Sequence, residues 1–202
     1  MAVTIDGTTG VSLVQDGTIT SAKLQDGIVT PAKLSGVTQG ITMTDQWRIN
    51  NAIQQGSAHT ETVINTNLER CDEATFGGVG SPMTQSSGVF TFPETGIYLV
   101  TFTATYYVPD NSSARYVYTY IKTATDGGTN FDDFANPLTS VPNPTTSTDF
   151  ASATAHAMIN ITNTSTHKVR FGFASDQTGL RIDGSTGINT SFMTFVRLGD
   201  SQ

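Results

Sequence analysis

Apolar and polar side chains alternate along most of residues 88–198. The clearest case is residues 97–108, where one face of an extended chain would be apolar and the other would carry threonines. The apolar face comprises Tyr98, Val100, Phe102, Ala104 and Tyr106. A period of two is typical of a β-strand with one buried face.

Six segments of this region have strand-like composition, and turn-forming residues separate them. Clusters of Pro, Gly, Asp and Asn lie at residues 93–96 and 109–112, between such segments. The stretch 137–144 is too rich in proline for a central strand and predicts a loop or a sheet edge. Short strands at this spacing predict an all-β sandwich. The expected strands are residues 89–92, 97–108, 114–123, 150–161, 168–174 and 191–198.

Residues 41–87 form a transition that we expect to supply the first strand of the sandwich. An alternating segment there would place three apolar residues on one face: Trp47, Ile49 and Ile53. A helix is the alternative, because Thr44 or Asp45 could cap its N-terminus. The alternation favours the strand. The sequence thus divides into residues 1–40, 41–87 and a C-terminal domain at 88–202.

Residues 1–40 contain a ten-residue repeat. Two adjacent copies begin at Asp16 and Asp26, and a looser copy begins at Asp6. Each copy has too few apolar residues to offset the entropy of ordering its backbone, about 1–2 kcal/mol per residue. We therefore expect an extended segment that becomes ordered against other copies of the chain or a docking surface. Its apolar positions recur every five residues and are the candidate attachment residues: Val14, Ile19, Leu24, Val29 and Leu34.

Composition narrows the possible functions. Only 13% of the residues are charged, against a usual share of about 25%. The net charge of −7 argues against nucleic acid binding, which needs clustered Lys and Arg. No apolar run approaches the roughly 20 residues that cross a bilayer, so we expect no membrane insertion. The N-terminus lacks the features of a secretory signal, which predicts synthesis in a cytoplasm without export.

The candidate chemistry of the chain is sparse. Cys71 is the only cysteine, so no intrachain disulfide can form, and no base adjoins it in sequence. No nucleophile elbow of the form G-x-S-x-G is present. We therefore expect no catalytic residues and a protein that is not an enzyme.

Two motifs in the C-terminal domain are similar to those of a known family. Residues 88–102 resemble the F-x-x-P-x-x-G-x-Y-x-x-x-F core of the complement C1q/TNF-like jelly-roll domains. Residues 190–198 resemble that family's final strand, with Thr194 where a glycine is usual. The resemblance implies a jelly-roll β-sandwich that assembles as a homotrimer. Our candidates for the trimer interface are Tyr98, Tyr118, Phe171 and Phe195.

The N-terminal repeats are similar to a second group. Their pattern D-G-x-[IV]-T-x-A-K-[LI] resembles repeats of bacteriophage tail-fibre and related virion appendage proteins. The combination implies a structural virion protein, a homotrimeric tail fibre or spike that other virion proteins hold through residues 1–40. The β domain would then adhere to a host-surface glycan or protein. The alternative is a head or neck decoration fibre that stabilises the particle.

One loop region is a candidate receptor-binding surface. Tyrosines and asparagines in loops suit stacking on sugars and polar contacts. A loop whose tyrosines pack in the core or at a subunit contact is the alternative. The candidate receptor-binding residues are Tyr107, Asp110, Asn111 and Tyr116.

A second loop is rich in oxygen ligands. Asp126, Asp132 and Asp133 lie in a Gly- and Asn-containing loop that could hold calcium. The spacing is not that of a helix–loop–helix calcium site, and a solvated turn is the alternative. No other cofactor is expected.

Overall fold

The computed structural model describes residues 5–6, 10–11, 40–109, 113–142 and 148–202. The chain forms two units, Met1–Gly40 and Ile41–Gln202. In the first, β1 (Ile5–Asp6) pairs antiparallel with β2 (Gly10–Val11). The candidate attachment residues lie outside the described residues: Val14, Ile19, Leu24, Val29 and Leu34.

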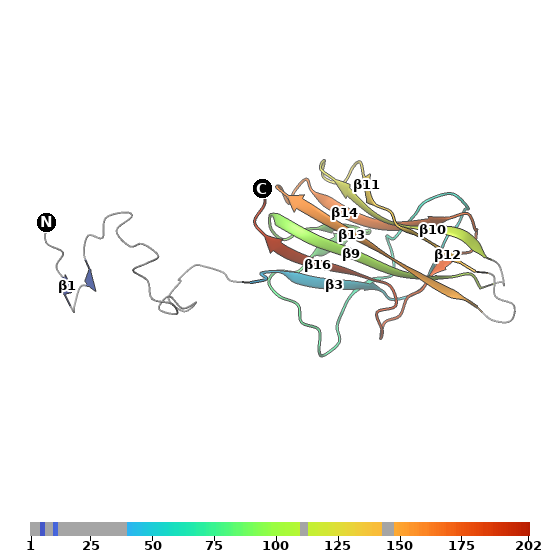
Figure 1. Ribbon diagram of the computed structural model, residues 1–202, viewed down its shortest axis with the longest axis horizontal. Coiled ribbons are helices and arrows are strands. Elements are labelled where there is room, and N and C mark those ends of the chain that lie inside the picture. The colour runs from blue at the N-terminus through green and yellow to red at the C-terminus, as the bar shows by residue number, and fades with distance from the viewer. Residues whose placement is uncertain (1–4, 7–9, 12–39, 110–112, 143–147) are drawn as a thin grey trace. The chain divides into compact units, whose positions relative to one another are not determined.

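The second unit, called the sandwich below, is all-β, and its described residues contain no helix. One of its two seven-stranded antiparallel sheets is built around β9 (Gly96–Tyr107) and is called the β9 sheet (Figure 1). β9 pairs with β13 along its full length and with β16 and β15 on its other side. The other strands of this sheet are β3 (Thr44–Ile49), β4 (Ile53–Gln54), β6 (Leu68–Arg70), β13 (Phe150–Ile161), β15 (Arg181–Ile182) and β16 (Phe192–Gly199).

The second sheet is built around β10 (Ala114–Ala124) and β14 (Lys168–Ser175) and is called the β10 sheet. β10 pairs with β14 over eight residues, from Val117 to Ala124. The remaining strands of this sheet are short: β5 (Thr62–Val63), β7 (Thr84–Ser86), β8 (Val89–Thr91), β11 (Asp132–Ala135) and β12 (Leu138–Val141).

The strands expected from alternation are confirmed. Each of the six expected segments coincides with β8, β9, β10, β13, β14 or β16, with ends that differ by two residues or fewer. The segment around Trp47 is also a strand, β3, so the helix alternative is wrong. The indole of Trp47 packs edge-on against Phe90 with ring centroids 5.5 Å apart. A helix would lose this cross-sheet contact and the pairing of β3 with β16.

The core lies between the two sheets and is strongly aromatic. In β9 every second residue from Gly96 to Tyr106 is buried, as a period of two requires. Phe171 of β14 meets Phe102 of β9 at 5.2 Å and Phe90 of β8 at 5.5 Å between ring centroids. Phe195 of β16 completes the cluster. These contacts hold the two sheets together.

Burial corrects three of the four trimer-interface candidates. Tyr98, Phe171 and Phe195 are 0% exposed within a single chain. Their side chains therefore have no surface to offer a neighbouring subunit. Tyr118 is different, because it points outward from the β10 sheet and is half-buried.

Candidate functional site

The outward residues of β9, β13 and β16 carry almost no charge. β9, β13 and β16 lie side by side (Figure 1). Their register aligns the outward residues in rows across the sheet. One row is apolar and joins Val196, Leu99 and Met158. The next row is polar but uncharged except for a histidine, and joins Thr194, Thr101 and His156. Met158 is 64% exposed, so this end of the face presents apolar surface to solvent.

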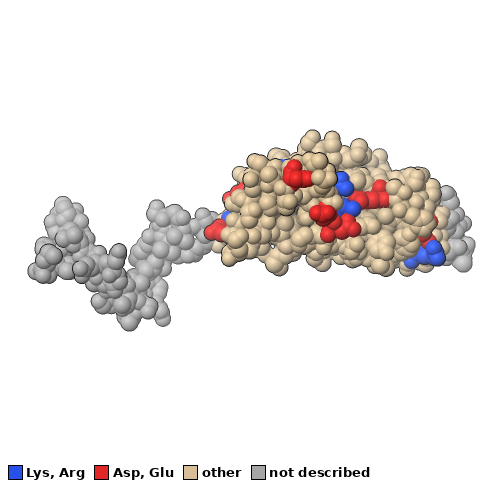
Figure 2. Space-filling model, turned by 90° about the horizontal axis from the view of Figure 1, so that it is seen from above, with Lys and Arg blue, Asp and Glu red and all other residues tan. Residues whose placement is uncertain are grey.

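The far end of the same face is held by hydroxyl pairs and one aromatic pair. The hydroxyl of Thr105 lies 3.0 Å from that of Ser152. The hydroxyls of Thr103 and Thr154 form a second pair between the same strands. Tyr107 lies against Phe150 with ring centroids 5.3 Å apart, and Phe150 is 58% exposed. Figure 2 shows a different view of the molecule, in which charged atoms are likewise few and gathered in small groups.

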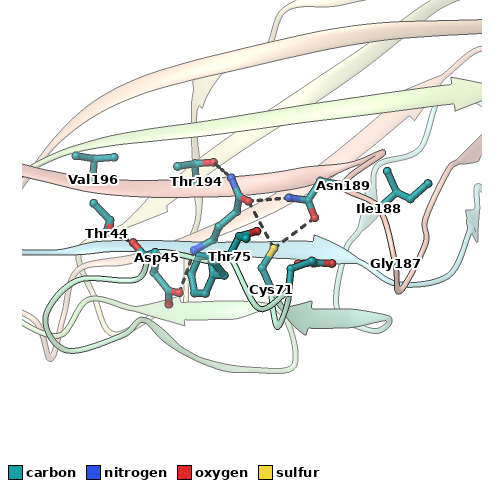
Figure 3. Close-up of a pocket in the computed structure, with 13 residues that line it drawn as sticks. Thr44, Asp45, Cys71, Thr75, Gly187, Ile188, Asn189, Thr194 and Val196 are labelled. Carbon is teal, nitrogen blue, oxygen red and sulfur yellow. Dashed lines mark hydrogen bonds between the residues drawn. The ribbon is translucent and has the colours of Figure 1, made fainter.

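A pocket of about 600 Å³ opens where this face meets two loops. Its floor is formed by outward residues of β3 and β16, and its walls by the segments after β6 and before β16 (Figure 3). The lining includes Gln46, Cys71, Phe76, Asn189 and Thr194. These residues come from parts of the chain that lie far apart in sequence.

Gln46 organises the polar side of the pocket. Its amide nitrogen donates to the Thr194 hydroxyl at 2.9 Å, and its amide oxygen accepts from the Asn189 amide at 2.7 Å (Figure 3). The thiol of Cys71 lies 3.4 Å from the Asn189 side-chain oxygen and 3.6 Å from that of Gln46. Thr194 thus has a role here that the usual glycine could not have.

A buried arginine fixes the wall of the pocket. Arg48 has a side chain that is 0% exposed, and it forms ion pairs with Glu69 at 3.1 Å and with Asp72 and Glu73. Burial of the Arg48 guanidinium acts to lower its pKa, but Glu73 and Glu69 outweigh this effect and raise it, and the hydrogen bond from Arg48 lowers the pKa of Glu73. The segment after β6 is therefore tied to β3 by charge-assisted hydrogen bonds.

Asp45 ties a second part of this wall to β3. Its buried carboxylate accepts hydrogen bonds from the Arg70 guanidinium at 2.7 Å, the Trp47 indole at 3.1 Å and the Met83 backbone at 2.9 Å. A buried carboxylate is stable only when its oxygens are satisfied in this way. Asp45 is thus a structural group that sets the shape of the pocket.

Cys71 is placed as an inert thiol. Burial raises its pKa, although its hydrogen bond to Asn189 acts in the opposite direction.

We expect iodoacetamide at pH 8 to alkylate Cys71 of the native protein more than about tenfold more slowly than in urea, because both access and thiolate fraction rise on unfolding. Mass spectrometry of timed samples measures this ratio. Equal rates would show that the loop over Cys71 opens readily.

The candidate receptor-binding residues do not come together. Tyr107 points outward from the β9 sheet, whereas Tyr116 points outward from the β10 sheet, so they lie on opposite faces of the sandwich. Asp110 and Asn111 fall outside the described residues. Tyr116 instead belongs to a row of tyrosines, considered below.

The acidic loop has other partners for its carboxylates. Asp126 accepts hydrogen bonds from the backbone of Thr129 at 3.0 Å and from the side chain of Asn130 at 2.7 Å, which lower its pKa. Asp133 forms an ion pair with Lys122 at 2.7 Å. The described part of the chain brings no three His, Cys, Asp or Glu side chains together as a metal site. Asp126, Asp132 and Asp133 therefore do not form one cluster, and calcium binding stays a prediction.

Sequence reasoning did not find the pocket. Gln46 and Asn189 are separated by 143 positions and belong to no recognisable motif. The one signal was Thr194 in place of the family's glycine. Similarly, Arg48 lies in a strand that was recognised, but nothing in the sequence marks its three acidic partners.

Comparisons with known proteins bear on the fold alone. No family model and no curated protein matches the sequence. Among solved structures, the sandwich is similar to Eiger TNF from S. frugiperda, with a TM-score of 0.55 and 12% identity over 81% of this chain and 96% of that one. It is also similar to murine APRIL at pH 8.5, with a TM-score of 0.51 and 11% identity over 77% and 98% of the two chains. These matches confirm a TNF-like jelly roll. In the described residues no helix is long and apolar enough to span a membrane.

Proposed function

We propose that the protein is a homotrimeric fibre or spike of a bacteriophage particle. Residues 1–40 attach it to other virion proteins, and the sandwich adheres to the host surface. The observation that carries the proposal is the outer face formed by β9, β13 and β16, which has no acidic side chain and suits contact with further copies of the chain. The repeat pattern at the N-terminus supports the virion setting.

The charge distribution supports self-association through this face. Copies of a chain with a net charge of −7 repel one another over most of their surface. The outward residues of β9, β13 and β16 include no acidic side chain, and the Arg48 guanidinium of β3 is buried. Exposed apolar residues such as Met158 and Phe150 gain most from burial by a neighbour. A three-fold ring repeats the same contact and closes.

Trimeric architecture also suits adhesion. A weak contact between one subunit and a surface glycan becomes effectively strong when three subunits bind together, because the second and third contacts form at high local concentration. A trimer held at one end by residues 1–40 would present three equivalent sandwiches. This arrangement needs no catalytic group.

A competition experiment tests the adhesive function. The purified full-length chain, added before the particle, should reduce particle adsorption to host cells at least several-fold, because it occupies the same receptors. An antibody against residues 88–202 should block adsorption and label the tail by electron microscopy. Labelling of the head or neck without any block would favour the decoration fibre. No labelling of the particle would overturn the virion role itself.

A further inference from the structure

Three tyrosines project in a row from the outer face of β10. Tyr116, Tyr118 and Tyr120 alternate with buried residues, and all three are half-buried. Their ring centroids lie 5.2 Å and 5.9 Å apart along the row. This spacing is comparable to the length of one hexose unit. The row runs along the opposite face of the sandwich from the proposed subunit contact.

Both ends of the row are fixed by other side chains. The His59 imidazole lies 2.6 Å from the Tyr116 hydroxyl. His59 has a φ of 60°, a left-handed conformation that is uncommon for this residue type and is found at functional positions. At the other end, the Lys122 ammonium lies 4.9 Å from the centre of the Tyr120 ring. These contacts restrain Tyr116 and Tyr120 before any ligand binds, which lowers the entropic cost of binding.

On its β14 side, the middle of the row faces small residues. Tyr118 and Tyr120 lie opposite Ala174 and Gly172 of β14, whereas on the other side of β10 Tyr118 pairs with Leu138 of β12. Within the described chain, the hydroxyls of Tyr118 and Tyr120 have no protein hydrogen-bond partner.

The nearby charges are already paired. Lys122 forms ion pairs with Glu61 at 2.6 Å and Asp133 at 2.7 Å, and Arg115 with Asp176 at 2.6 Å. An ionic ligand would have to compete with these pairs. A neutral ligand with many hydroxyl groups would not.

We propose that the row of Tyr116, Tyr118 and Tyr120 binds a neutral glycan, whose hexose rings stack on the phenol rings and whose hydroxyls bond to the free tyrosine hydroxyls. Aromatic rings offer large, rigid contact surfaces at low entropic cost. The inference rests on the proposed adhesive function and names its site and ligand class.

Calorimetric titration of the full-length chain tests the inference. The probes are linear neutral hexasaccharides of glucose, galactose or mannose. We expect at least one to bind, and Tyr118→Ala to raise its Kd about tenfold or more, as loss of a central aromatic contact does. Tyr118→Phe keeps the ring and should retain most of the affinity.

Three results would overturn the inference: no binding of any neutral hexasaccharide, unchanged affinity in Tyr118→Ala with a wild-type circular dichroism spectrum, or tighter binding of an acidic polygalacturonate than of the neutral probes.

The adhesive function and the glycan site can be refuted independently. If the chain blocks adsorption but Tyr118→Ala blocks it equally well, the adhesive function stands and this site is wrong. If the tyrosines bind glycan but the chain never competes with the particle, the site stands and adhesion is wrong.

Discussion

Replacement of Phe171 by alanine is expected to lower the free energy of unfolding by about 4 kcal/mol. Phe171 is fully buried and contacts the rings of Phe90, Phe102 and Phe195 from both sheets. The truncation removes apolar surface and leaves a cavity between the sheets, which a rigid strand pair cannot close. Urea denaturation followed by tryptophan fluorescence measures the loss, at one fixed protein concentration because assembly contributes to stability.

Phe134→Ala is the matched control for this prediction. Phe134 belongs to β11 of the β10 sheet and is 49% exposed, so its removal should change the free energy of unfolding by no more than about 1 kcal/mol. Equal effects of the two substitutions would mean that Phe171 does not join the sheets as described. A Phe171→Ala chain that folds normally but fails to assemble would restore Phe171 to the subunit interface.

Leu99→Asp is expected to convert the proposed trimer to single chains. Leu99 lies at the centre of the apolar row, between Val196 and Met158. Assembly of the variant would bury three unpaired carboxylates. Each costs several kcal/mol, and together they exceed the association free energy of an interface of moderate size. Analytical ultracentrifugation at micromolar concentration should give three times the chain mass of 21.5 kDa for the wild type and 21.5 kDa for the variant.

Leu138→Asp serves as the control for assembly. Leu138 is 59% exposed and pairs with Tyr118 in the β10 sheet, so the same change there should leave the mass of the assembly unaltered. A wild-type chain that sediments only as a 21.5 kDa species would refute the trimer. A trimeric Leu99→Asp variant would move the interface away from the β9 sheet.

Strands such as β9 and β13 could be predicted because each has one buried face, and burial imposes a period of two on the sequence. Alternation also grouped Tyr98 correctly with Val100 and Phe102, which are all in the core. It could not say which side of a strand faces the other sheet and which faces a neighbouring chain. Both environments select large apolar side chains, and for that reason Tyr98, Phe171 and Phe195 were assigned to the wrong one.

The pocket and the tyrosine row depend on contacts that no local pattern encodes. Gln46 meets Asn189 because β3 and β16 pair, and this pairing follows from the whole topology. Tyr116 was selected because its loop is rich in tyrosine and asparagine. Its neighbours Tyr118, Tyr120 and His59 could be identified only from the direction of β10 and the position of the loop before β5.

Because the outward residues of β9, β13 and β16 carry few charges, the proposed assembly would persist over a wide range of salt concentrations. Dissolved ions weaken attractions between opposite charges over about 10 Å at 0.1 M salt, but they do not weaken the burial of apolar surface. Subunits joined through threonines, Leu99 and Met158 would therefore stay together in fresh water, in concentrated salt and in cytoplasm. A virion of the kind proposed above would meet all of these conditions between one host cell and the next, and its fibre would stay assembled.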